Sequence, residues 1–198
     1  MQKSLSITKK SGGRAAQGYA YISLGRVYNN LCLLEKAAEF SQKGLNISKE
    51  IKLKKLEGHA YANFGHLYRH LGDLNTSFEF WEKALVFAKE TGNKALEGFM
   101  YRNLSLTFRD FSNFEKAIEF LQQALSIAKE IENKLLHESA NEAQGSVFAS
   151  LGNSSKAEEH FKSSIKVFEE IRDLQKKMNG KSVFTKDMKF ILLYGVLL

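Results

Sequence analysis

The sequence predicts an all-α fold, a right-handed superhelical solenoid of antiparallel helix pairs. Its 198 residues contain no proline, so no position has to interrupt a helix. A 40-residue period runs through most of the chain, as expected for a stacked repeat array. Each period holds two helical patterns separated by a short break, so the period corresponds to one helix pair.

The repeats align with one another without a gap. Four units cover 18–57, 58–97, 98–137 and 138–177. Residues 1–17 superpose on 121–137, so we expect a half repeat there and an array that spans 1–177, with about nine helices. Residues 178–198 match none of the units.

The first helix of each unit carries a column of small residues between large ones. The small column holds Gly25, Gly65, Ser105 and Gly145, and the aromatic column three residues later holds Tyr28, Tyr68, Phe108 and Phe148. A small residue lets the partner helix approach closely, while the aromatic rings fill the space beside it. We therefore expect the aromatic column to be buried between the helices.

The second helix of each unit has its own apolar columns. They hold Ala37, Ser77, Ala117 and Ala157, then Phe40, Phe80, Phe120 and His160, and later Leu45, Leu85, Leu125 and Ile165. Chain reversals are expected at Gly72, Gly92 and Gly152, because glycine commonly ends a helix. The linkers are short, so neighbouring helices should pack antiparallel, and each pair should bury its second apolar side against the next pair.

These repeated motifs resemble the tetratricopeptide repeat family. The resemblance rests on "YISLGRVY", "YANFGHLY" and "YRNLSLTF" in the first helices and on "EKA" and "AL.IAKE" signatures in the second helices. It is similar to the longer 40-residue form seen in the Leu-Gly-Asn repeat adaptors and in very large animal arrays. The resemblance covers 1–177 and implies a non-enzymatic, protein-binding scaffold in which the first helices line a concave groove.

The implied groove face is rich in cationic, amide and aromatic side chains. The predicted peptide-binding residues are Tyr19, Arg26, His59, Asn63, His66, His70, Phe99, Arg102 and Asn103. Arginine and histidine can donate to carboxylates, amides can hold a peptide main chain, and aromatic rings give apolar contact. We therefore expect an acidic peptide as the partner, with binding that tightens as the pH falls from about 7.5 to about 6.

Other chemistries are disfavoured by the sequence. His59 lies about 10 Å along the helix from His66, at ~1.5 Å per residue, so these residues and His70 cannot share one metal ion. The chain has no Gly-rich phosphate loop and no HExxH or GxSxG motif, so we expect no cofactor and no enzyme activity. A chaperone-type carboxylate clamp would need basic residues where Leu106 and Asp110 stand.

The net charge of +7 leaves nucleic-acid binding as the alternative function. Residues 1–14 and 172–198 carry +4 each, which leaves −1 for the middle of the chain. A phosphate-binding surface would need a continuous basic stripe, so the basic ends make nucleic acid the minor alternative.

Composition predicts the cellular location of the protein, and the length of its apolar C-terminal segment limits what that segment can do. The single cysteine, Cys32, and the lack of an apolar leader predict a cytoplasmic protein. The apolar segment 190–198 is too short to span a membrane, which needs about 20 residues. The tail 178–198 is either a capping helix, with Phe184, Met188, Ile191 and Leu192 against the fourth unit, or disordered. Open ends of the array would support self-association.

Overall fold

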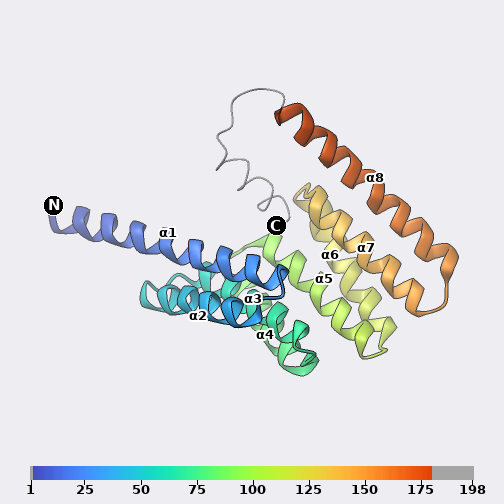
Figure 1. Cartoon of the computed structure of the whole chain (residues 1–198), viewed down its shortest axis with the longest axis horizontal. Helices are drawn as coiled ribbons and strands as arrows, with labels where there is room; N and C mark the ends of the chain where they lie inside the picture. The colour runs from blue at the N-terminus through green and yellow to red at the C-terminus, as the bar shows by residue number, and fades with distance from the viewer. Residues whose placement is uncertain (1, 180–198) are drawn as a thin grey trace. The chain divides into compact units, whose positions relative to one another are not determined.

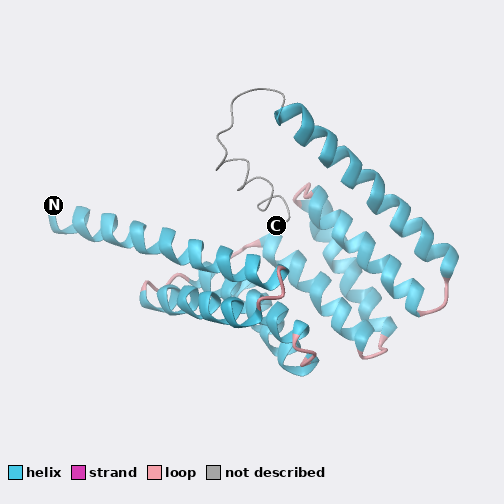
Figure 2. Cartoon of the chain, in the orientation of Figure 1, coloured by secondary structure: helices cyan, strands magenta, loops and turns pink. Residues whose placement is uncertain are grey.

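The computed structural model describes residues 2–179, with side chains described for 13–165 and for 169. This part of the chain contains eight helices and no strand (Figures 1 and 2). The helices are α1 (Gln2–Asn30), α2 (Leu34–Glu50), α3 (Lys54–His70), α4 (Leu74–Glu90), α5 (Lys94–Asp110), α6 (Phe114–Glu130), α7 (Lys134–Ser150) and α8 (Ser154–Asn179). The all-α prediction is confirmed.

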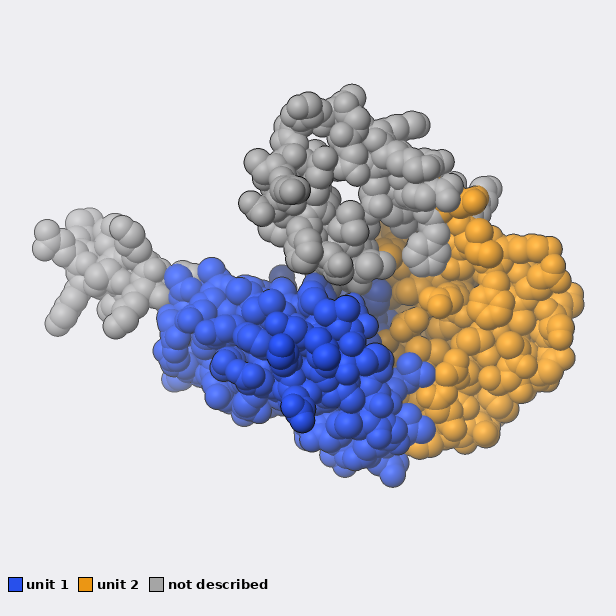
Figure 3. Space-filling model, viewed as in Figure 1, with its two compact units in different colours: residues 1–100 blue, residues 101–198 orange. Residues whose placement is uncertain are grey.

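The chain divides into two compact units, residues 1–100 and 101–198 (Figure 3). In unit 1, α1 packs on α2 and α3, α2 also packs on α3, and α3 packs on α4. In unit 2, α6 packs on α7, and α7 packs on α8. Within each unit these helices contact their sequence neighbours, which is the contact pattern of a repeat array.

The helix count differs from the expected nine because α1 is continuous from Gln2 to Asn30. The half repeat expected at 1–17 would place a break near Gly13, which is equivalent to Leu53, Asn93 and Asn133 at the starts of later first helices. Leu53 packs against the core, and Asn93 and Asn133 cap the helices that follow them. Gly13 has no side chain for either interaction, so nothing equivalent marks a break there.

The helices are joined by one turn geometry that recurs every 20 residues. A residue of positive φ ends each of the first seven helices, at Cys32, Lys52, Gly72, Gly92, Ser112, Glu132 and Gly152. The next backbone N–H donates to a carbonyl five residues earlier, over 2.9 Å from Leu33 to Tyr28 and 2.8 Å from Asn93 to Ala88. These are Schellman caps, and the reversals predicted at the three glycines are confirmed.

Glycine should be favoured at the four turns that lack it. Lys52→Gly and Glu132→Gly are each expected to raise the free energy of unfolding by about 0.5 to 1 kcal/mol, since side chains disfavour the left-handed region. The reverse change, Gly92→Ala, should lower it by a similar amount, although a Cβ there meets nothing within 4 Å. Urea denaturation measures all three. Equal midpoints would show that the backbone at these turns carries no strain.

Stacked rings join the two helices of each pair. Tyr28 stacks on Phe40 with centroids 5.3 Å apart, and the same columns give Tyr68 on Phe80 at 5.3 Å, Phe108 on Phe120 at 5.2 Å and Phe148 on His160 at 5.3 Å. Lysines cover some of the outer rings, for example Lys116 over Phe108 at 5.3 Å. The aromatic column lies between the helices as expected but is only partly buried, because its outer edge faces solvent and lysine stems.

The small-residue column does mark close helix approach. A Cβ on Gly65 would overlap the indole of Trp81, which is fully buried. A Cβ on Gly145 would lie 2.8 Å from the Phe161 ring. In both pairs the glycine faces a large ring on the second helix, so the predicted close packing is confirmed.

The outer face of α8 differs from the same face of earlier second helices. Phe161 is 37% exposed and Ile165 is 57% exposed, whereas the column of Phe161 is fully buried at Trp81 and Leu121. No later helix covers this face among the residues that the structure describes. The predicted capping segment falls in 178–198, of which 180–198 and all the side chains lie outside the described residues, so the cap remains a prediction.

Candidate functional site

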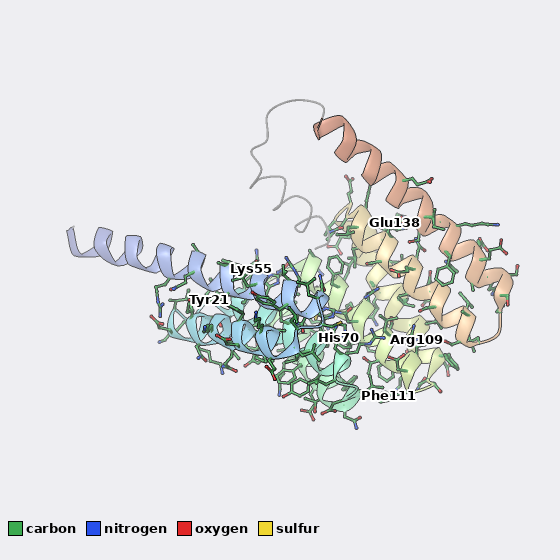
Figure 4. The ribbon with its side chains drawn as sticks, viewed as in Figure 1. Tyr21, Lys55, His70, Arg109, Phe111 and Glu138 are labelled. Carbon is green, nitrogen blue, oxygen red and sulfur yellow. The ribbon has the colours of Figure 1, made fainter. Side chains whose placement is uncertain are left out.

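The first helices of unit 1 place most of the predicted binding residues on their surface. Tyr19 on α1 is 39% exposed, and Arg26, two turns later, is partly exposed. On α3, His59 and His66 are partly exposed and His70 is exposed. Figure 4 labels Lys55 near the start of α3 and His70 at its end. These side chains can contact a ligand without any change in the helices.

Arg26 is a partly buried cation without a counter-charge in the described part of the chain. No hydrogen bond or ion pair joins its guanidinium to another described residue, and burial lowers its pKa to about 10. Arg69 and His66 supply further donors on α3, and the rings of His66 and Trp81 form a T-shaped pair with centroids 5.6 Å apart. An anion beside Arg26 would restore the interaction that the guanidinium loses on leaving water.

His59 is held as a neutral imidazole. The side chain of Asn93 is oriented by its own cap, because its Oδ1 accepts from the backbone N–H of Leu96 at 3.2 Å. Its Nδ2 therefore faces the Nε2 of His59, 3.4 Å away, and donates to an unprotonated nitrogen. Burial, Lys55 and Arg26 together lower the pKa of His59 to about 4. In the ligand-free protein His59 thus carries no charge between pH 7.5 and 6.

The two asparagines predicted to hold a peptide main chain are buried instead. Asn63 is 4% exposed, and its Nδ2 donates to the backbone oxygen of Ile22 at 2.7 Å. The backbone oxygen of Asn63 in turn accepts from Asn29 Nδ2 at 2.9 Å. Asn103 is 3% exposed and accepts from Arg102 Nη1 at 3.3 Å. Sequence spacing placed these amides on the correct helices but could not show that they are buried.

Asn63 is expected to contribute to stability. Asn63→Ala should lower the free energy of unfolding by about 2 kcal/mol, because the buried hydrogen bond to the Ile22 carbonyl is lost and the space of the amide is left empty. Asn46→Ala is the matched control, since Asn46 is exposed and accepts only from Gln42 at 2.7 Å. Urea denaturation compares the two variants. If Asn63→Ala melts like Asn46→Ala, the amide is dispensable for folding and its role as a peptide contact regains support.

The first helices of unit 2 pair their cations internally. Arg102 Nε donates to the backbone oxygen of Ser139 at 3.3 Å, and its Nη2 lies 3.7 Å from Glu142. Arg109 donates to Ser146 Oγ at 2.9 Å and pairs with Asp110 at 2.6 Å. Phe99 is partly buried near the start of α5, within unit 1. Arg102 and Arg109 thus already have acidic neighbours, unlike Arg26.

Sequence reasoning missed several residues around this surface. Lys55 and Asn93 both act on His59, and Arg69 and Arg109 occupy one column that holds Asn29 in the first unit. The recurrence of long polar side chains in that column was a visible signal. No signal in the sequence indicated the contact between Asn93 and His59, because asparagine is common in turns and Asn93 lies in one.

Neither a metal-binding cluster nor a membrane-spanning helix is present among the described residues. Among them, no group of three or more histidine, cysteine, aspartate and glutamate side chains could hold a metal ion. Within the same residues, no helix combines the length and apolar character needed to cross a bilayer. Of the basic residues at the N-terminal end, Arg14 pairs with Glu50, while the side chains of Lys3, Lys9 and Lys10 lie outside the described set.

Comparison with known proteins identifies the repeat. The family model of the tetratricopeptide repeat matches residues 57–130. No curated protein sequence matches the chain. Among solved structures, BtubC from P. vanneervenii is similar at 19% identity and a TM-score of 0.60, over 85% of this chain and 67% of BtubC.

Two further structures share the fold. A signal transduction ATPase with numerous domains from Pyrococcus horikoshii, which has a tetratricopeptide repeat sensor, is 22% identical with a TM-score of 0.63. The match covers 82% of this chain but only 25% of the ATPase, so the chain spans about a quarter of that protein. Nearly identical TPR-like repeats from Podosopora anserina are 12% identical with a TM-score of 0.59, over 78% of this chain and 75% of theirs. Residues 57–130 therefore match the tetratricopeptide repeat family, and the chain as a whole shares the fold of these solved structures.

Proposed function

We propose that the protein is a protein-interaction scaffold that binds an acidic peptide segment on the first helices of unit 1. Tetratricopeptide repeats support the general role, since such repeats are scaffolds rather than enzymes as a rule. The observation that carries the acidic preference is the difference between the two units. Arg26 has no acidic partner among the described residues, while Arg102 and Arg109 have Glu142 and Asp110.

The surface offers three kinds of contact to such a peptide. The guanidinium of Arg26 can bind a carboxylate with two parallel hydrogen bonds. Tyr19 lies two turns before it on α1 and offers an exposed ring for apolar contact. His66 and His70 on α3 add donors further along the helix. Asn63 and Asn103 are not peptide contacts in this proposal, because their amides already bond to Ile22 and Arg102.

Fluorescence anisotropy of a labelled oligoglutamate peptide tests the proposal. Arg26→Gln is expected to weaken binding by about tenfold, the loss of one charge-assisted contact of about 1.4 kcal/mol. Lys83→Gln is the control with the same change in net charge, because Lys83 is exposed on a second helix, over the ring of Phe80. The control should bind the peptide like the parent protein.

Two results would contradict the proposal. Equal losses in Arg26→Gln and Lys83→Gln would mean that the peptide responds only to net charge. No binding of oligoglutamate, together with salt-sensitive binding of an oligonucleotide that Arg26→Gln leaves unchanged, would favour the nucleic-acid alternative and its basic ends.

A further inference from the structure

Two interhelical hydrogen bonds place Arg26 and His59 beside the same junction of α1 and α3. Asn63 Nδ2 donates to Ile22 O at 2.7 Å, and Asn29 Nδ2 donates to Asn63 O at 2.9 Å. Arg26 lies one turn after Ile22 on α1, and His59 lies one turn before Asn63 on α3. Both side chains thus belong to the same junction, and the positive charge of Arg26 contributes to the lowered pKa of His59.

The electrostatics at this junction are unbalanced. The charged groups that act on His59 are Lys55, on its own helix, and Arg26, on α1. The contact from the turn between α4 and α5 is the neutral amide of Asn93. No described carboxylate contributes to the environment of His59 or of Arg26. The missing component is an anion.

We propose that Arg26 and His59 bind one oxyanion group of the acidic partner, and that His59 takes up a proton from solvent as that group binds. Arg26 supplies the permanent charge, and Lys55 adds longer-range attraction. The bound oxyanion offsets the repulsion from both cations, so the imidazolium becomes favourable where the free protein disfavours it. This inference rests on the proposed function and adds to it a site and a mode of regulation.

Protonation of His59 would also change its contact with Asn93. A proton on Nε2 removes the lone pair that accepts from Asn93 Nδ2, so this contact must open as the imidazolium forms. Anion binding should therefore tighten as the pH falls toward the pKa of His59 in the complex. The free protein gives no such response between pH 7.5 and 6, since His59 is neutral there in the absence of the anion.

The experiment is an NMR titration of the imidazole of His59 in the full chain, in sodium sulfate and in sodium chloride at equal ionic strength. Sulfate is the probe because it stays ionised over the range in which histidine titrates, and equal ionic strength removes the effect of screening. The signal is assigned by its loss in His59→Gln. The pKa of His59 should be at least one unit higher in sulfate than in chloride.

Arg26→Gln separates a specific site from general charge effects. In chloride, this variant should itself raise the pKa of His59, because a repelling charge is removed. The additional rise in sulfate should then disappear. Equal pKa values of His59 in sulfate and chloride would overturn the proposal, as would a sulfate response that survives Arg26→Gln.

The outcomes separate this inference from the proposed function. If oligoglutamate binds through Arg26 but sulfate leaves His59 unchanged, the scaffold proposal stands and the proton-coupled site is wrong. If sulfate shifts His59 but oligoglutamate does not bind, the oxyanion site stands and the acidic-peptide proposal is wrong.

Discussion

Trp81→Ala is expected to lower the free energy of unfolding by about 3 to 5 kcal/mol, as large-to-small changes of fully buried aromatic residues do. The indole of Trp81 is completely buried, and it occupies the space that Gly65 leaves on α3. Its removal leaves a cavity that a neighbouring side chain cannot fill without moving a helix. Urea denaturation followed by circular dichroism measures the loss.

The same contact should show strong coupling in a double-mutant cycle. Gly65→Ala alone should cost about 1 to 3 kcal/mol, because its Cβ overlaps the indole. In a Trp81→Leu background the cost should be smaller, since repeat 98–137 holds Ser105 and Leu121 at the equivalent positions, both fully buried. Additive effects would show that Gly65 and Trp81 do not pack against each other.

Periodicity predicted the helix pairs and their close contacts because each unit repeats the same arrangement of small and large residues on its two helices. The glycine column opposite large rings, and the reversals at Gly72, Gly92 and Gly152, depend on residues within 20 positions of one another. The continuity of α1 did not follow in the same way. The pattern at 1–17 resembles a second helix, but Gly13 lacks the side chain that would mark its end.

The candidate site was less predictable because burial depends on the neighbouring repeat. Asn63 has the spacing of a surface residue on α3, yet α1 covers it and uses its amide. Arg26 and His59 were placed on the predicted face, but their lack of acidic neighbours is a property of two helices and one turn. A sequence shows which residues share a helix face and leaves open which of them a second helix covers.

Acidification should destabilise the protein through His59. The pKa of His59 is about 4 in the folded state and about 6.5 ordinarily, mainly because burial disfavours the charged form. Above pH 6.5 His59 is neutral in both the folded and the unfolded state, so it does not affect how the free energy of unfolding depends on pH. As the pH falls from about 6.5 to about 4, the unfolded chain binds a proton that the folded state excludes. The free energy of unfolding should therefore fall by about 3 kcal/mol over this range.

His59→Gln should remove this part of the acid dependence, because glutamine cannot be protonated in this range and can still bond to Asn93. Urea midpoints at a series of pH values compare this variant with the parent and with His70→Gln, a change at the exposed end of the same helix. A parent protein that loses no more stability than His59→Gln would show that the imidazole is charged in the folded state. In that case the contact with Asn93 Nδ2 cannot be a hydrogen bond to an unprotonated Nε2, and an anion would no longer be needed to bring a proton to His59.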